Sequence, residues 1–241
     1  MTDAAKTLVL SDLHLGNGAG YDIFAGDESL PALLQTFARR DHGVILNGDT
    51  FDFLMNEDPL ELDEARAVRQ AAQTFAAPAT AAALRALGGV LAAGGDVAIR
   101  LGNHDIELAL DGVQDGLREA LGQPAAVAGR LRFERGDKPS IVTAGGARIL
   151  ITHGEQSDGW NKVDYLHLPG PGSAPGAAAS SFDYAAGSRL VKTIMNPLKR
   201  VYGLRLIDLI KPDFQGGVLT ALAIAPAAVR EVFKGSTLQL L

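Results

Sequence analysis

The sequence predicts an α/β fold with a largely parallel inner sheet. Short apolar runs with strand character alternate with longer segments of helical spacing, which is the order that joins parallel strands through helices. Four of the apolar runs end directly in a polar cluster. Because ligand sites in α/β sheets lie at the carboxyl ends of the strands, this pattern also predicts a functional site at one edge of the sheet.

The individual elements follow from local patterns along the chain. Short apolar, partly β-branched runs predict strands at residues 7–10, 44–46, 96–101, 131–133, 140–143 and 148–152. Apolar side chains at helical intervals predict helices at residues 30–40, 58–91 and 106–121. Pro31 falls in the first turn of the first helix, and Pro78 is expected to divide the second.

The chain changes character after His153. Residues 168–181 are rich in Pro, Gly, Ala and Ser, which is typical of a flexible linker. Residues 188–211 have helical spacing with an expected kink at Pro197, and they carry six Lys or Arg residues against one acid. We therefore expect a core domain at 1–159, a Pro/Gly/Ala-rich linker at 160–187 and a basic amphipathic helical insertion or cap at 188–241.

Composition excludes several classes of function. The net charge of −6 argues against non-specific nucleic-acid binding, and the lack of cysteine excludes disulfides, thiolate metal sites and Cys nucleophiles. Residues 1–7 have no apolar core of signal-peptide length, and no apolar run is long enough to span a membrane. We expect a cytoplasmic protein.

The first two polar clusters are Asp12-Leu13-His14 and Gly48-Asp49. A carboxylate and an imidazole two residues apart reach one metal if the loop turns, and an Asp can offer one oxygen to each of two metals. Each cluster has a structural alternative when taken alone, namely a turn Asp beside a surface His and an Asn-Gly-Asp turn. Asp52, in the second loop, is either a partner of a ligand or a solvated side chain.

The third cluster, Gly102-Asn103-His104-Asp105, is the most specific. Asn103 offers a neutral carbonyl ligand, and His104 can give a proton to a leaving oxygen or stabilise phosphate charge. Asp105 is expected to fix the tautomer of that imidazole. The alternative is a helix start capped by Asn103. The fourth cluster, His153-Gly154, would by itself indicate a structural histidine bonded to backbone.

Together the clusters predict a site for two divalent metals. Its mixed oxygen and nitrogen ligands are Asp12, His14, Asp49, Asn103 and His153. A set without thiolate suits Mn²⁺, Fe or Zn²⁺ better than a structural zinc site. A shared aspartate implies two ions about 3.5–4 Å apart, with a metal-bridging hydroxide as the nucleophile for in-line attack on phosphorus.

These residues resemble the first four of five sequence blocks of the calcineurin-like metallophosphoesterases, over about residues 7–155. Residues 11–16, 47–52 and 153–158 are similar to the branch that contains UDP-2,3-diacylglucosamine hydrolases. The resemblance implies a four-layer α/β/β/α sandwich. It also implies two metal ions, for which we expect Mn²⁺ and, as alternatives, Fe or Zn²⁺. One ion would be held by Asp12, His14 and Asp49, and the other by Asp49, Asn103 and His153. His104 would be the catalytic imidazole, supported by Asp105.

One family feature is missing. The fifth block, Gly-His-x-His, would add a ligand to each metal, and it is absent from these 241 residues. His42 precedes the second strand, on the wrong side of the sheet, and His167 precedes the linker, so neither is expected to replace it. We expect the natural chain to continue past Leu241, with the sandwich incomplete at its C-terminus and residues 160–235 an insertion.

The predicted activity is two-metal-dependent hydrolysis of phosphate esters or pyrophosphates. One alternative is a metal-poor scaffold that serves as an interaction module, which the missing block favours and the clustered carboxylates oppose, since they repel each other without a cation. A nuclease of the same superfamily is a second alternative. The acidic balance and the lack of base-stacking aromatics argue against it.

The basic segment at 188–211 has three interpretations. As a cap, it would bring Arg189, Lys192 or Arg200 to the phosphate of a small-molecule or lipid-linked nucleotide substrate. As a membrane-surface helix, it would hold the protein at the inner face of the membrane as a peripheral partner. The third interpretation is a helix packed on the core with a solvated charged face.

Overall fold

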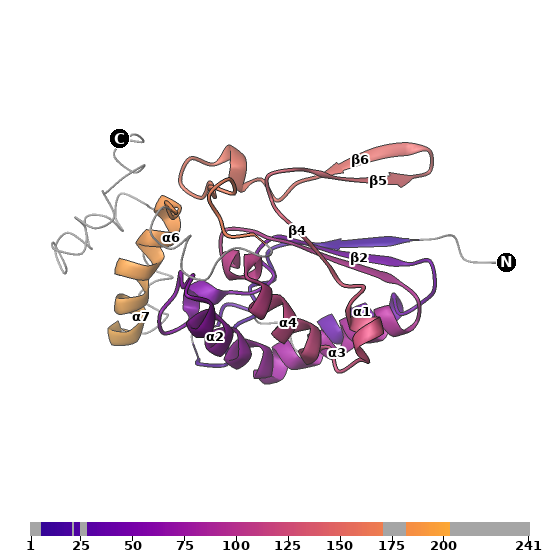
Figure 1. Cartoon of the computed structure of the whole chain (residues 1–241), viewed down its shortest axis with the longest axis horizontal. Helices are drawn as coiled ribbons and strands as arrows, with labels where there is room; N and C mark the ends of the chain where they lie inside the picture. Colours follow the sequence, from indigo (N-terminus) through magenta and orange to yellow (C-terminus); the bar gives the residue numbers. More distant parts are fainter. Residues whose placement is uncertain (1–5, 21, 25–27, 171–181, 203–241) are drawn as a thin grey trace.

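The computed structural model describes residues 6–20, 22–24, 28–170 and 182–202. Its main sheet has four parallel strands in the spatial order β1-β2-β3-β4 (Figure 1). The strands are β1 (Thr7–Leu10), β2 (Gly43–Asn47), β3 (Asp96–Arg100) and β4 (Arg132–Glu134). The predicted α/β fold with a parallel sheet is confirmed, and the chain order of the strands is also their spatial order.

Helices cover one face of this sheet and form the main hydrophobic core with it (Figure 1). They are α1 (Ser29–Thr36), α2 (Glu64–Ala76), α3 (Pro78–Ala92), α4 (Asp111–Ala120) and the short α5 (Ala125–Ala128). Short 3-10 helices at Phe53–Met55 (η1), Ile106–Ala109 (η2) and Glu155–Ser157 (η3) follow the second, third and fourth polar clusters. Each of these three clusters thus lies between the end of a strand and a short 3-10 helix.

A β-hairpin covers part of the other face of the sheet. Its strands are β5 (Ser140–Ala144) and β6 (Ala147–Ile151), joined at two glycines with positive φ. A second small core forms where Ile151 of the hairpin meets Ile45 and Ala98 of the sheet. The outward side chains of the hairpin are exposed, with Leu150 at 63%. The described residues therefore contain the helix layer and both sheet layers, and no helix among them lies over the hairpin (Figure 1).

Helix boundaries differ from the predicted ones for local reasons. The helix expected at 58–91 begins at Glu64, because the Asp63 carboxylate accepts a hydrogen bond from the Arg66 N–H and caps it. Pro78 does divide it, as the first residue of α3. The helix expected at 106–121 is interrupted at Leu110, which has an extended backbone. Within the described ranges no single helix is both long and apolar enough to cross a membrane, although α2 and α3 pass that test as a bent pair.

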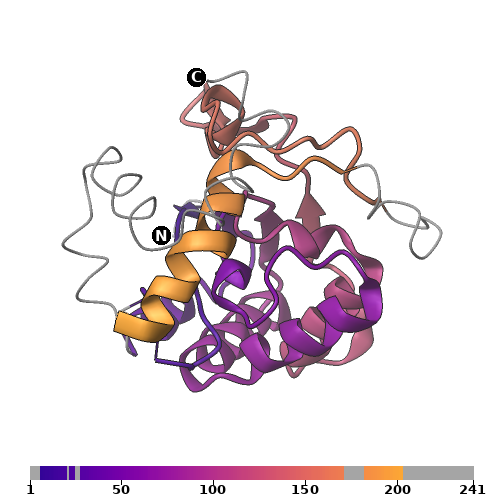
Figure 2. The same cartoon turned by 90° about the vertical axis from the view of Figure 1, so that its left-hand side faces the viewer.

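A second helical unit lies beyond the carboxyl ends of the strands. It consists of α6 (Ala186–Leu190), a π-helical segment (Val191–Met195) and α7 (Asn196–Tyr202). Seen from that end of the molecule, the unit crosses in front of the sheet edge (Figure 2). The π-helical segment ends just before Pro197, at the position where an irregularity was expected. The remainder of the predicted basic helix and residues 171–181 of the Pro/Gly/Ala-rich stretch lie outside the described residues.

Candidate metal centre

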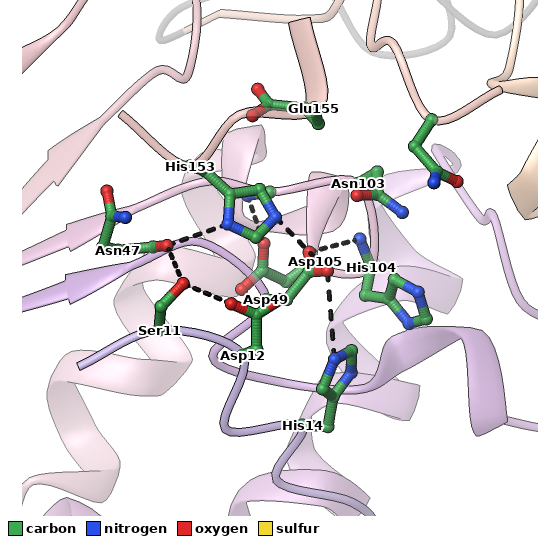
Figure 3. Close-up of polar contacts among 12 residues, drawn as sticks. Ser11, Asp12, His14, Asn47, Asp49, Asn103, His104, Asp105, His153 and Glu155 are labelled. Atoms are coloured by element: carbon green, nitrogen blue, oxygen red, sulfur yellow. Dashed lines mark hydrogen bonds and ion pairs between the residues drawn. The ribbon is translucent and has the colours of Figure 1, made fainter. Parts of the chain in front are cut away.

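The four polar clusters meet at the carboxyl edge of the sheet (Figure 3). Asp49 lies in the middle and belongs to two groups of side chains whose ligand atoms lie within 4.8 Å of one another. One group contains Asp12 and His153, and the other contains His14 and His104. Loops after β1, β2, β3 and β6 therefore converge on one carboxylate.

The loops after β1 and β2 hold three of these residues in left-handed backbone conformations. Asp12, His14 and Asp49 have φ values of +56°, +49° and +49°. Such conformations are unfavourable for residues other than glycine and persist where surrounding contacts impose them. Here the two loops stay paired beyond the strands, because the His14 N–H donates to the Asp49 carbonyl at 2.9 Å and the Leu15 N–H donates to the Thr50 carbonyl at 2.9 Å.

Two glycines make room for the cluster. A Cβ at Gly48 would lie 2.3 Å from the His153 ring, and a Cβ at Gly102 would lie 2.1 Å from the Asp49 carboxylate. Both distances are far inside van der Waals contact, so any side chain at these positions would displace a candidate ligand. This accounts for the Gly in the Gly48-Asp49 and Gly102-Asn103-His104-Asp105 clusters.

Asp49 is buried and is bound by groups from two loops. Its Oδ1 accepts a hydrogen bond from the His104 N–H at 2.9 Å, and its Oδ2 lies 3.4 Å from His153 Nε2 and 4.0 Å from His14 Nε2. Burial favours the neutral acid, but the hydrogen bond to His153 and the charge of His104 outweigh it and lower the pKa of Asp49. The carboxylate therefore stays ionised, as a metal ligand must.

His153 is oriented through its other ring nitrogen. Its Nδ1 lies 2.9 Å from the Asn47 carbonyl, which can only accept, so Nδ1 carries a proton and Nε2 faces Asp49. The Asn47 side chain in turn donates to the Thr152 carbonyl and fixes the end of β6. Burial opposes the charged imidazolium, yet the hydrogen bond and charge of Asp49 raise the pKa of His153 to about 9. Asn47 is a positioning residue that the motif reading missed.

The expected pairing of His104 with Asp105 is wrong. His104 Nδ1 lies 2.9 Å from an oxygen of Asp52, which is fully buried. Asp105 instead accepts hydrogen bonds from the backbone N–H groups of Gly102, Thr50 and Phe51. The carboxylate of Asp105 is therefore bound by backbone N–H groups near the ends of β2 and β3 and not by the imidazole.

The pKa values of Asp105, His104 and His14 are shifted by their surroundings. Burial and then the charge of Asp49 raise the pKa of Asp105 to about 7, against the effect of its backbone donors. For His104, burial lowers the pKa, but the hydrogen bond and charge of Asp52 outweigh burial, so the net shift is upward. For His14 the largest effects are burial and the nearby His104, and its pKa is lowered. Of these two neighbouring imidazoles, His104 is thus the one that favours a proton.

The remaining predicted site residues have mixed placements. Asn103 is buried beside His104 (Figure 3), and its backbone carbonyl accepts a long hydrogen bond from Ser188 of α6 at 3.4 Å. His42 is buried at the start of β2, against the ring of Phe37. His167 is exposed and hydrogen-bonded to Asp164. Neither of these two histidines belongs to the metal groups found among the described residues.

The basic side chains proposed to contact substrate are engaged beside the centre. Arg189 forms an ion pair with Asp183 at 2.6 Å. Lys192 donates to the Pro59 carbonyl at 2.8 Å, and Arg200 donates to the Glu57 carbonyl at 3.0 Å. The contacts of Lys192 and Arg200 join the helical unit at 186–202 to the segment that follows the Gly48-Asp49 loop.

The donor set fits divalent metal ions. Ionised Asp49 and the Nε2 atoms of His14 and His153 converge with Asp12, and hard oxygen and imidazole ligands are those that Mn²⁺, Fe and Zn²⁺ accept. Carboxylates as close as those of Asp12 and Asp49 repel one another, which a bound cation would relieve. The strained backbone at three of the residues indicates that the arrangement serves function and not stability.

The buried Glu107 of η2 predicts a pH-dependent stability next to the centre. Burial raises its pKa to about 7, from a reference value of 4.5. A raised folded-state pKa means that the stabilisation is present below the unfolded value and lost as pH rises through about 7. Between about pH 5 and about pH 8, the unfolding free energy of the wild type should therefore fall by on the order of 2 kcal/mol more than that of Glu107→Gln.

Urea unfolding at both pH values measures this difference. Glu119→Gln is the matched control, because Glu119 is exposed on α4. An identical pH dependence in the wild type and Glu107→Gln would show that Glu107 is ionised in the folded protein without penalty.

A comparison with known proteins agrees with the geometry. A family model described as calcineurin-like phosphoesterase matches residues 5–205. The match begins ahead of β1 and ends beyond α7, so it includes every residue of the candidate centre and the helical unit across it. No curated protein matches the chain.

Proposed function

Because this chain belongs to the calcineurin-like phosphoesterase family, we propose that it hydrolyses phosphate esters or pyrophosphates with two divalent metal ions, Mn²⁺ before Fe or Zn²⁺. The observation that carries the proposal is the position of Asp49. It is shared by two groups of candidate ligands, and its two oxygens face different neighbours. When bound, the metals would supply Lewis acidity and an activated water as nucleophile.

The ligand roles proposed for the two ions share Asp49. We assign Asp12, His14 and Asp49 to one ion, and Asp49, Asn103 and His153 to the other. Among the described residues, the ligand atoms of Asp12 lie with those of Asp49 and His153, while those of His14 lie with Asp49 and His104. His153 is prepared for its role, because the Asn47 carbonyl holds its Nδ1–H and leaves Nε2 as the ligand atom.

His104 is proposed to hold a proton for the leaving oxygen. Its Nδ1–H donates to Asp52, which leaves Nε2 toward the substrate side. Although burial lowers it, the hydrogen bond and charge of Asp52 raise the pKa of His104 overall, which favours the cationic form. A cationic imidazole both stabilises phosphate charge and gives up a proton. Asp105 contributes by fixing the loop that carries His104, through its three backbone donors.

The substrate class proposed is a phosphorylated small molecule or a lipid-linked nucleotide. Support comes from the helical unit at 186–202, which lies across the sheet edge with Lys192 and Arg200 exposed. Their present acceptors are neutral backbone carbonyls, so substrate phosphate would offer a stronger partner. We also propose that the enzyme is cytoplasmic and contacts the inner face of the membrane peripherally, because the same basic surface would attract anionic lipids.

Turnover of bis-p-nitrophenyl phosphate and p-nitrophenyl phosphate by the metal-stripped chain, with and without Mn²⁺, tests the proposal. We expect hydrolysis that requires Mn²⁺ and that His153→Asn reduces by roughly 10²-fold or more, since one metal loses a ligand. His167→Asn is the matched control, because this exposed histidine lies outside the centre. A chain that binds Mn²⁺ but hydrolyses neither ester would contradict the proposal, and so would equal rates in the two variants.

A further inference from the structure

Asp52 lies between two imidazoles. Its Oδ1 is 2.9 Å from His104 Nδ1, and its Oδ2 is 3.7 Å from His14 Nδ1. The two rings meet edge to face, with centroids 4.6 Å apart. One carboxylate therefore faces both imidazoles, with a different oxygen toward each.

The longer of these two contacts joins two atoms that could form a hydrogen bond with each other. Asp52 Oδ2 and His14 Nδ1 are both buried, and neither has a hydrogen-bond partner within the described part of the chain. Leaving a buried acceptor and a buried donor unpaired costs free energy on both sides. A shortening by about 0.7 Å would bring the pair to hydrogen-bonding distance and satisfy both atoms.

The local backbone holds Asp52 for this purpose. Asp52 occupies the position before η1, where an Asp commonly caps the helix, yet its side chain forms no capping hydrogen bond. Its N–H donates to the Leu15 carbonyl at 3.0 Å, and the next N–H, of Phe53, donates to the His104 carbonyl at 3.2 Å. The residue is thus tied to both loops that carry the histidines, and its carboxylate remains available to them.

We propose that Asp52, the hydrogen-bond partner of His104, is also a positioning residue for His14 and therefore orients a proposed metal ligand. The role at His14 rests on the proposed function, in which His14 binds a metal. A proton held on Nδ1 by Asp52 leaves His14 Nε2 as the ligand atom, on the side where Asp49 lies at 4.0 Å. The metal centre and the proton donor are thereby aligned by one side chain.

The chemistry of the carboxylate makes this double role testable. Both oxygens of an ionised carboxylate accept, so Asp52 can receive one N–H from each imidazole. An asparagine has one accepting oxygen and one donating amide, so Asp52→Asn can keep at most one of the two contacts. The substitution conserves shape, and it should disturb His14 and not only His104.

Two measurements test the proposal, and neither depends on turnover. In long-range ¹⁵N–¹H spectra of the metal-free chain, we expect the neutral His14 of the wild type to carry its proton on Nδ1 and that of Asp52→Asn to carry it on Nε2. Titration with Mn²⁺ should show affinity lower by roughly 10–100-fold in Asp52→Asn, the usual effect of losing a group that orients a ligand. Asp115→Asn, an exposed change on α4, should leave both readings as in the wild type.

The proposal is overturned if His14 carries its proton on Nε2 in the wild type. It is also overturned if Asp52→Asn alters His104 while the His14 signals and the Mn²⁺ affinity match those of Asp115→Asn. Should Asp52→Asn fail to fold by circular dichroism, the wild-type spectrum decides alone. A chain that hydrolyses no ester would end the proposed function but leave the tautomer of His14 to be read.

Discussion

Asp49→Asn is expected to reduce Mn²⁺-dependent hydrolysis by at least about 10³-fold, the largest effect of any single change in the centre. The physical reason is that Asp49 is the residue shared by both groups of candidate ligands. An amide has the same shape but carries no charge and offers only one accepting oxygen, so it cannot bind two cations at once. The number of Mn²⁺ ions bound should also fall, and calorimetric titration measures both the number and the affinity.

The matched control for this change is Asp115→Asn, which removes the same charge from an exposed position on α4. It should leave turnover and metal binding at wild-type values. If Asp49→Asn kept two tightly bound Mn²⁺ ions and near-normal turnover, Asp49 would not be the bridging ligand. The assignment of the centre would then have to be abandoned.

His104→Asn is expected to lower kcat by about 10²–10⁴-fold while the chain still binds Mn²⁺ with nearly its normal affinity. The two effects separate because His104 is proposed to act on the leaving oxygen and not as a metal ligand. Its backbone N–H to Asp49 Oδ1 does not depend on the side chain and would be retained.

The leaving group provides the sharpest readout for His104. An ester with a poor leaving group, such as a phenyl ester, needs the proton more than a p-nitrophenyl ester does. The loss of kcat in His104→Asn should therefore be larger for the phenyl ester. An equal loss for both esters would argue that His104 acts only through charge, and a loss of Mn²⁺ binding would make it a ligand.

Much of this architecture was predictable because it depends on local patterns. Apolar runs of strand length mark β1, β2 and β3, and the polar clusters after them follow from where each run ends. Parallel strands place their carboxyl ends together, so the meeting of the clusters at one edge follows from the fold class. Pro78 likewise marks the start of α3, since proline suits the first turn of a helix.

The partner of His104 could not be predicted in this way. Asp105 is adjacent in sequence, but its carboxylate is captured by three backbone N–H groups, two of which belong to the loop after β2. Asp52 lies more than fifty residues away, and it reaches the imidazole only because that loop is paired with its neighbours. The one signal in the sequence is Asp52 itself, three residues after Asp49. Its position predicts either a partner of a ligand or a solvated side chain, and does not decide between them.

The strained backbone at the centre was equally hidden. The residue types Asp12, His14 and Asp49 do not by themselves specify a positive φ, although Asp and His adopt it more often than other residues with a side chain. The conformation is imposed by hydrogen bonds between the loops after β1 and β2, and these form only in the folded chain. The extended backbone of Leu110, which interrupts the helix expected at 106–121, is likewise not indicated by the helical pattern of the sequence.

The most direct test of the central claim is anomalous X-ray diffraction from crystals of the chain grown with Mn²⁺. Two anomalous peaks about 3.5–4 Å apart, on either side of the Asp49 carboxylate, are the predicted result. The surrounding side chains should be those of Asp12, His14, Asn103 and His153. Absence of any peak at Asp49 under saturating Mn²⁺ would contradict the account, and the carboxyl edge of the sheet would then not be a metal centre.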